Sequence, residues 1–157
     1  MNSPLVPTLT RDVYLSDDIW AAERDRIWSA QWVLVGRAHD VVAAGDRLVV
    51  DVAGESIVVV RGDDDALRGF YNVCRHRGAE LVPPDGPMCG SFGSMIRCPY
   101  HAWTYGLDGV LRRAPFLGRD DTPEVALHAV AVAEWGGFVF VNLSGADAET
   151  LNDQLGP

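Results

Sequence analysis

Two short stretches decide the fold of this chain: C-R-H-R-G at residues 74–78 and C-P-Y-H-A-W at residues 98–103. Each holds one cysteine and one histidine, spaced C-x-H in the first and C-x-x-H in the second. Each follows a run of residues typical of a β-strand, which predicts that both form tips of β-hairpins facing one another. Four thiolate and imidazole ligands from two such tips can enclose a tetrahedral metal ion or a small iron–sulfur cluster. The candidate ligands are Cys74, His76, Cys98 and His101.

The mixture of thiolates and imidazoles favours a cluster of two irons and two sulfides. Four thiolates would leave the oxidised cluster doubly negative, whereas two thiolates and two neutral imidazoles leave it uncharged. An electron enters an uncharged cluster more easily, so this ligand set raises the reduction potential. The alternative is a structural zinc site, but zinc motifs usually space their ligands as C-x₂₋₄-C and H-x₃₋₅-H. The two pairs in this chain do not have that spacing.

The remaining cysteine, histidines and tryptophans are interpreted without a metal. Cys89 has no partner at ligand spacing, so it is expected to be a free thiol in a plain connector at 86–93. His39 and His128 are expected to be structural histidines. Trp103 is expected to pack beneath the second loop and keep water away from the metal. The other tryptophans are assigned to the core: Trp20, Trp28, Trp32 and Trp135.

Composition and charge exclude several classes of protein. The 157 residues suit one domain, and 48% hydrophobic with 22% charged residues is ordinary for a globular chain. With 22 acidic against 13 basic residues, the net charge of −9 argues against nucleic-acid binding. No apolar run approaches the ~20 residues that cross a bilayer, and residues 1–10 do not resemble a secretory signal. Three cysteines make no disulfide scaffold, so we expect a cytoplasmic protein.

Short β-branched and aromatic runs separated by turn residues predict an all-β domain, an antiparallel sandwich or barrel, with flanking helices. The expected strands are 32–36, 46–52, 55–61, 67–73, 104–105, 110–111, 127–133 and 138–143. Asp108-Gly109 is a strong hairpin signal. One helix is expected from Ser16 to about Ala30, and another from near Ser144 to Gly156-Pro157. The expected division is therefore an arm and helix at 1–31, a β domain at 32–143, and a closing helix with the start of a linker at 144–157.

The two loop motifs resemble the Rieske [2Fe–2S] domain, in the version found in α subunits of Rieske non-haem iron, aromatic ring-hydroxylating oxygenases. The similarity extends to F-Y-N-V at 70–73, H-A-W-T-Y-G-L-D-G at 101–109 and W-G-G-F-V-F-V-N at 135–142. It implies a Rieske-type antiparallel β sandwich with two cluster-binding hairpin loops. It also implies that Cys74 and Cys98 hold the inner iron, and that His76 and His101 hold the outer one. Respiratory Rieske proteins link their loops by a disulfide whose positions are Ala79 and Tyr100 in this chain, so that bridge cannot form.

The resemblance implies one-electron transfer from a reductase or ferredoxin to the mononuclear iron centre of a hydroxylating or demethylating oxygenase. In the family a larger catalytic domain binds that Fe(II) through two histidines and a carboxylate. Only His39 and His128 remain here after the cluster ligands are assigned. We therefore expect the catalytic domain, its iron and a complete active site to lie outside this chain. A dioxygenase, a monooxygenase and a demethylase are all compatible, and the family implies a possible homo-oligomer, often a trimer. The alternative is a stand-alone Rieske ferredoxin, an electron carrier.

Arginines gather around the two motifs. The segment from residue 74 to residue 113 contains five arginines and three acidic residues. The arginines are Arg75, Arg77, Arg97, Arg112 and Arg113, and the acidic residues are Glu80, Asp85 and Asp108. The rest of the chain is strongly acidic, so this basic collar could orient an acidic electron donor. Alternatively, the arginines serve local structure by pairing with those acids or binding the loop backbones.

Overall fold

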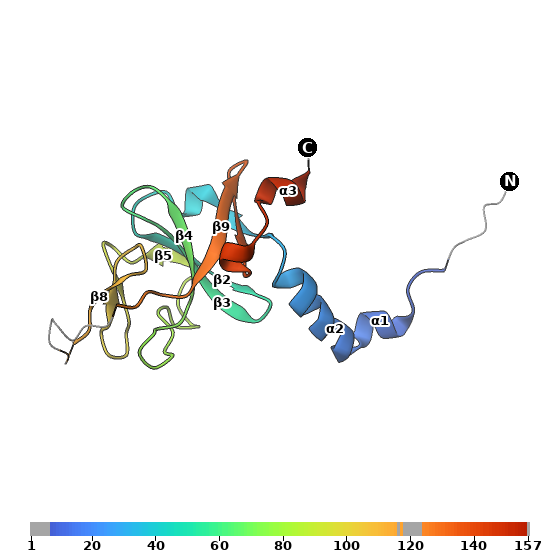
Figure 1. Ribbon diagram of the computed structural model, residues 1–157, viewed down its shortest axis with the longest axis horizontal. Helices are drawn as coiled ribbons and strands as arrows, with labels where there is room; N and C mark the ends of the chain where they lie inside the picture. The colour runs from blue at the N-terminus through green and yellow to red at the C-terminus, as the bar shows by residue number, and fades with distance from the viewer. Residues whose placement is uncertain (1–6, 116, 118–123, 157) are drawn as a thin grey trace.

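Antiparallel strands form the body of the molecule in a computed structural model that describes residues 7–115, 117 and 124–156 (Figure 1). Within these residues a larger sheet has the order β1-β10-β9-β4-β3-β2-β5, and a smaller one has the order β6-β7-β8. β1 also contacts β2, so the larger sheet curls towards a half-barrel. The larger sheet holds β1 (Val33–Arg37), β2 (Asp46–Val52), β3 (Glu55–Arg61), β4 (Leu67–Tyr71), β5 (Cys89–Ser91), β9 (Ala129–Trp135) and β10 (Phe138–Asn142). The smaller sheet holds β6 (Ile96–Arg97), β7 (Thr104–Tyr105) and β8 (Leu111–Arg113).

The all-β prediction with flanking helices is confirmed, and most strands lie where the sequence places them. The Asp108-Gly109 hairpin joins β7 to β8, where Gly109 adopts a φ of 80° that favours glycine. β9 and β10 pair around Gly136-Gly137, as predicted. Two short strands were not predicted: β5, inside the supposed connector, and β6. Each lacks a β-branched run, and each is a strand only because a neighbour, β2 or β7, supplies hydrogen bonds.

Two groups of buried side chains fill the body. One group packs together within the curve of the larger sheet and consists of Val41, Leu48, Val52, Ile57, Val59, Val130, Val139 and Val141. The other joins the larger sheet to the smaller one and includes Cys74, Cys98, Trp103 and Tyr105. The second group therefore contains residues of both loop motifs. No helix among the described ranges is long and apolar enough to cross a membrane.

The predicted N-terminal helix is present, but it extends away from the body, which corrects the core assignment of its tryptophans. The chain forms α1 (Arg11–Leu15), α2 (Asp17–Glu23) and a π-helical turn η1 (Arg24–Trp28), which extend away from the sheets (Figure 1). Ser16 caps α2 as predicted, by accepting a hydrogen bond from the Ile19 amide. The assignment of Trp20 and Trp28 to the core is wrong, because they are 51% and 42% exposed. Helical spacing shows which residues share a face but not whether anything covers that face.

Trp135 is also wrongly assigned to the core, since it is 54% exposed at the end of β9. Trp32 is half-buried, and its indole N–H donates to the Glu149 carbonyl. The closing helix begins later than predicted: α3 (Leu151–Leu155) starts after Thr150, whose hydroxyl accepts from the Asp153 amide. The residues after Ser144 form a short 3₁₀ turn, η4 (Gly145–Asp147). Another 3₁₀ turn, η2 (Ala38–Asp40), follows β1.

Candidate metal centre

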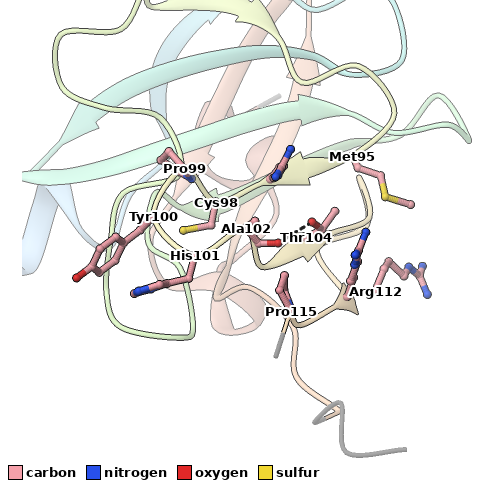
Figure 2. A pocket seen from close by; sticks show the side chains of 11 residues that line it. Met95, Cys98, Pro99, Tyr100, His101, Ala102, Thr104, Arg112 and Pro115 are labelled. Carbon is pink, nitrogen blue, oxygen red and sulfur yellow. Dashed lines mark hydrogen bonds between the residues drawn. The ribbon is translucent and has the colours of Figure 1, made fainter. Parts of the chain in front are cut away.

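The second motif is a hairpin tip, as predicted. β6 and β7 pair through Ile96 with Tyr105 and Arg97 with Thr104, and residues 98–103 connect them. Within the tip, the Cys98 amide donates to the Trp103 carbonyl at 2.8 Å and the Ala102 amide to the Cys98 carbonyl at 3.1 Å. Figure 2 shows the sulfur of Cys98 and the rings of Tyr100 and His101 on one side of this loop, away from Arg112 and Met95. The strand pair at its base therefore aims one thiol and one imidazole in a common direction.

The first motif is not a hairpin tip, which corrects the prediction. β4 ends at Tyr71, and both its edges are already paired, with β3 and with β9. The chain after β4 turns back on itself instead: the Cys74 amide donates to the Ala79 carbonyl, and the Gly78 amide donates to the Cys74 carbonyl. It returns to the core at Leu81 and Val82, which are both 4% exposed. A central strand has no free edge to offer a returning partner, so this loop is held by other contacts.

The structure brings the four predicted ligands together from the two loops. Cys74 and Cys98 are both 2% exposed and belong to the same buried group of side chains. His76 and His101 are only half-buried, and their ring centroids lie 4.9 Å apart in an edge-to-face arrangement. The thiols are therefore the deep pair and the imidazoles the outer pair. The family resemblance implied this order of depth, whereas the spacing of the residues did not, because depth depends on how far each loop reaches over the core.

The protonation tendencies of these side chains suit metal ligation. Burial raises the pKa of the Cys74 thiol, and the neighbouring Cys98 adds to the effect. A buried thiolate therefore needs a cation beside it, and a metal ion supplies one. Partial desolvation lowers the pKa of His76, and His101 and Arg77 lower it further. Its imidazole is therefore neutral at pH 7, as a metal ligand must be.

Two observations test whether a metal cluster fits these residues. Nδ1 of His101 is buried and has no hydrogen-bond partner within the described part of the chain. Such an atom is costly unless something coordinates it, and a metal does. In the same part of the chain, no three His, Cys, Asp or Glu side chains converge as they would around one ion. The donor set itself, two deep thiols and two outer imidazoles, matches the two-thiolate, two-imidazole ligand set of a two-iron cluster.

Tyr105 is a residue of the site that sequence reasoning missed. Its side chain is fully buried, and its hydroxyl lies 3.2 Å from the Cys74 sulfur and accepts a hydrogen bond from the Arg75 amide at 3.1 Å. Burial raises the pKa of Tyr105, so the phenol keeps its proton. Because the oxygen accepts from Arg75, its own hydrogen is free to be donated to the Cys74 sulfur. This contact joins the two loops, and only the position of Tyr105 just after the second motif hinted at it.

Trp103 makes a second contact between the loops. It is 8% exposed, and its ring stacks on that of His76, with centroids 4.7 Å apart and planes within 7°. The predicted burial is confirmed, but the ring packs on the first loop as well as within the second. A flat stack of this kind restricts rotation of the imidazole. That Trp103 keeps water away from a metal stays a prediction.

The outer side of the site is lined by arginines. A groove of about 990 Å³ next to His101 includes Arg97, Arg112 and Arg113 among its lining residues. Arg112 forms an ion pair with Asp108. All five arginines of the collar are exposed, and Arg75 also donates to the Ala126 carbonyl at 2.7 Å. Arg75 and Arg112 therefore serve local structure, whereas the orientation of an acidic donor by the exposed arginines stays a prediction.

The remaining candidates lie outside this group. Cys89 is an exposed free thiol in β5, as predicted. His39 contacts Asp40 at 3.2 Å at the surface, and His128 is exposed just before β9.

Comparisons with known proteins show what this chain resembles in sequence and in fold. A model of the Rieske [2Fe–2S] domain family matches residues 31–133. The carnitine monooxygenase oxygenase subunit of Acinetobacter pittii is 35% identical over 157 residues, covering 98% of this chain and 41% of that protein. The apo crystal structure of the quaternary ammonium Rieske monooxygenase CntA superposes with a TM-score of 0.82 at 34% identity, over 94% of this chain and 43% of that one. Naphthalene 1,2-dioxygenase with bound indole gives a TM-score of 0.81 at 27% identity, over 92% and 32%.

We predict that replacing either deep thiol removes the metal. Cys74→Ser and Cys98→Ser should each lose nearly all bound metal, because ligation energy is part of the folding energy of such loops. Cys89→Ser, which changes the exposed thiol, should keep its full metal content. Elemental analysis of the purified variants checks this. Full metal content in Cys74→Ser or Cys98→Ser would contradict the site as assembled here.

Proposed function

We propose that this chain, which belongs to the Rieske [2Fe–2S] domain family, carries single electrons from a reductase or ferredoxin to the mononuclear non-haem iron of an oxygenase. A bound [2Fe–2S] cluster supplies the one-electron couple. The observation that carries the proposal is the layering of the four side chains, with two buried thiols below two half-exposed imidazoles. An electron can then reach or leave a buried centre through an imidazole edge at the surface.

The proposed ligands are Cys74 and Cys98 for the inner iron, and His76 and His101 for the outer one. The depth of the two thiols supports the inner assignment. The assignment of the histidines to the outer iron is supported by the lowered pKa of His76 and by the buried Nδ1 of His101, which has no hydrogen-bond partner among the described residues. The chain's own residues hold these ligands: Tyr105 donates to the Cys74 sulfur, and Trp103 stacks on His76. Both contacts orient the first loop from the second.

The oxygenase role is favoured over a stand-alone ferredoxin by what the relatives share. The family model covers only residues 31–133. The Acinetobacter relative matches 98% of this chain. The match to an oxygenase subunit therefore also includes the N-terminal helices and the closing segment. The chain spans about 41% of that relative's length. We propose that the catalytic iron is supplied by a further domain or a separate subunit, and that the subunits assemble as a homo-oligomer such as a trimer.

The names of the relatives favour one substrate class for the whole oxygenase. Carnitine and glycine betaine monooxygenase oxygenase subunits are 30% to 36% identical to this chain. We therefore propose oxidation of a quaternary ammonium compound, although a biphenyl dioxygenase α subunit is also 30% identical.

The proposed division of the chain stays 1–31, 32–143 and 144–157. The proposed location is the cytoplasm, because a reducing compartment keeps ligand thiols available.

Redox titration tests the proposed function. The purified chain should be red-brown and contain iron and acid-labile sulfide in equal amounts. Anaerobic titration with dithionite should bleach it with one electron for each pair of irons. Reoxidation should restore the colour over repeated cycles, because the buried thiols stay in place. A colourless protein that holds zinc and no sulfide would overturn the proposal.

The hydroxyl of Tyr105 should raise the reduction potential. A donor to a ligand sulfur stabilises the more negative, reduced state, so Tyr105→Phe should lower the midpoint potential. A hydrogen bond worth about 1 kcal/mol corresponds to roughly 40 mV, since about 59 mV is a tenfold change for one electron. Voltammetry at neutral pH measures the shift. Tyr100→Phe is the matched control, because Tyr100 is 62% exposed and Phe keeps a ring beside His101. Equal potentials for Tyr105→Phe and the wild type would refute this role.

Charge reversal in the groove tests how the donor docks. Arg97→Glu and Arg113→Glu should slow reduction by a prereduced acidic [2Fe–2S] ferredoxin roughly tenfold at low salt, because they remove attraction beside His101. Arg26→Glu, on the remote turn η1, is the control and should change little. At 1 M salt, where the Debye length is about 3 Å, the differences should disappear. Stopped-flow absorbance follows the rates, and equal slowing in all three variants would mean that the groove has no docking role.

A further inference from the structure

The two ligand loops are supported in different ways. The second loop stands on the paired strands β6 and β7, so ladder hydrogen bonds close its base. The first loop leaves β4, whose two edges are taken by β3 and β9, and the next strand in the chain, β5, pairs with β2 instead. No strand partner therefore closes the base of the first loop, although all its residues lie in the described part of the chain. Something else must hold the segment that carries Cys74 and His76.

The side chain of Asn72 bridges the two ends of the first loop. Asn72 follows β4, lies two residues before Cys74 and is 3% exposed. Its carbonyl oxygen accepts hydrogen bonds from the backbone amides of Leu81 at 3.1 Å and Val82 at 2.9 Å. Its amide nitrogen donates to the Val82 carbonyl at 2.7 Å. One side chain thus binds both the amide and the carbonyl of Val82, as a neighbouring strand would.

The same side chain ties the loop to the larger sheet. The amide nitrogen of Asn72 donates its second hydrogen to the Ser56 hydroxyl on β3 at 3.1 Å, and the Asn72 backbone amide donates to the Ser56 carbonyl at 2.8 Å. Both hydrogens and both lone pairs of the side-chain amide are then used. The arrangement also sets the amide's orientation, because a flipped side chain would place its NH₂ against the backbone amides of Leu81 and Val82.

We infer that Asn72 is a positioning residue that replaces the missing strand pair and holds the first loop closed around the cluster. This inference rests on the proposed cluster ligands, but the hydrogen bonds that carry it do not depend on them. Leu81 and Val82 are buried, so opening the loop would expose apolar side chains and leave two backbone amides unpaired. Serine, aspartate or alanine cannot make the same four bonds in that space. The asparagine is therefore a requirement of this topology rather than a generic polar residue.

The test compares Asn72→Ala with a matched buried asparagine. Asn142 is 2% exposed, donates to the Ala30 carbonyl and accepts from the Ser144 amide, and it supports the base of the N-terminal helices. Asn142→Ala therefore controls for the general cost of losing a buried amide. Asn72→Asp keeps the shape and the bonds accepted from Leu81 and Val82, and it provides a second variant if Asn72→Ala folds poorly. Amide hydrogen exchange and the rate of cluster bleaching by excess chelator are measured for each holoprotein.

In Asn72→Ala, exchange at the Leu81 and Val82 amides and cluster bleaching should each become at least about tenfold faster, as expected for a lost buried bridge. The second-loop amides of Cys98 and Ala102 should keep their protection, because their partners are within that loop. Asn72→Asp should also exceed the wild-type rates, because a carboxylate oxygen replaces the group that donates to the Val82 carbonyl. Unchanged exchange at Leu81 and Val82, or equal bleaching in Asn72→Ala and Asn142→Ala, would overturn the inference. If the wild type holds no iron and sulfide, the proposed function fails, and the exchange data alone decide the role of Asn72.

Discussion

The rest of the structure depends on one requirement: two thiols must be buried next to each other and still be available as thiolates. Burial raises the pKa of Cys74, so that state is stable only with a cation in the site. The fold meets the requirement by placing the thiols between its two sheets, at 2% exposure, and leaving the imidazoles nearer the surface. The larger sheet provides the floor of the site, and the smaller sheet provides a hairpin that reaches over it.

The second loop does more than contribute two ligands, because it also holds the first. Tyr105 contacts the Cys74 sulfur and the Arg75 amide, and Trp103 stacks on His76. Paired strands close the base of the second loop, so its contacts can restrain the first loop, which has no such base. Asn72 supplies the remaining support from the side of the larger sheet. Respiratory Rieske proteins link their two loops by a disulfide, but the corresponding residues here are Ala79 and Tyr100. Hydrogen bonds and ring stacking join the two loops of this chain instead.

Much of this could be predicted from local pattern, and the remainder could not. Cysteine and histidine at close spacing identify a metal site because few other structures need them there, and β-branched runs locate most strands. Hydrogen bonds between residues far apart in the sequence, such as those of Tyr105 and Asn72, leave no periodic signal. The exposure of Trp20 could not be predicted either, since it depends on what covers a helix and not on the helix itself. The short strands β5 and β6 are determined by their partners rather than by their own residues.

The central claim is that two imidazoles and two thiolates hold one two-iron cluster. Pulsed electron paramagnetic resonance of the reduced protein, prepared with ¹⁵N-labelled histidine, tests it most directly. We expect couplings from two histidine nitrogens, with one of them lost in His76→Cys and in His101→Cys. A spectrum without histidine coupling would mean that the site is ligated in another way and would contradict the account.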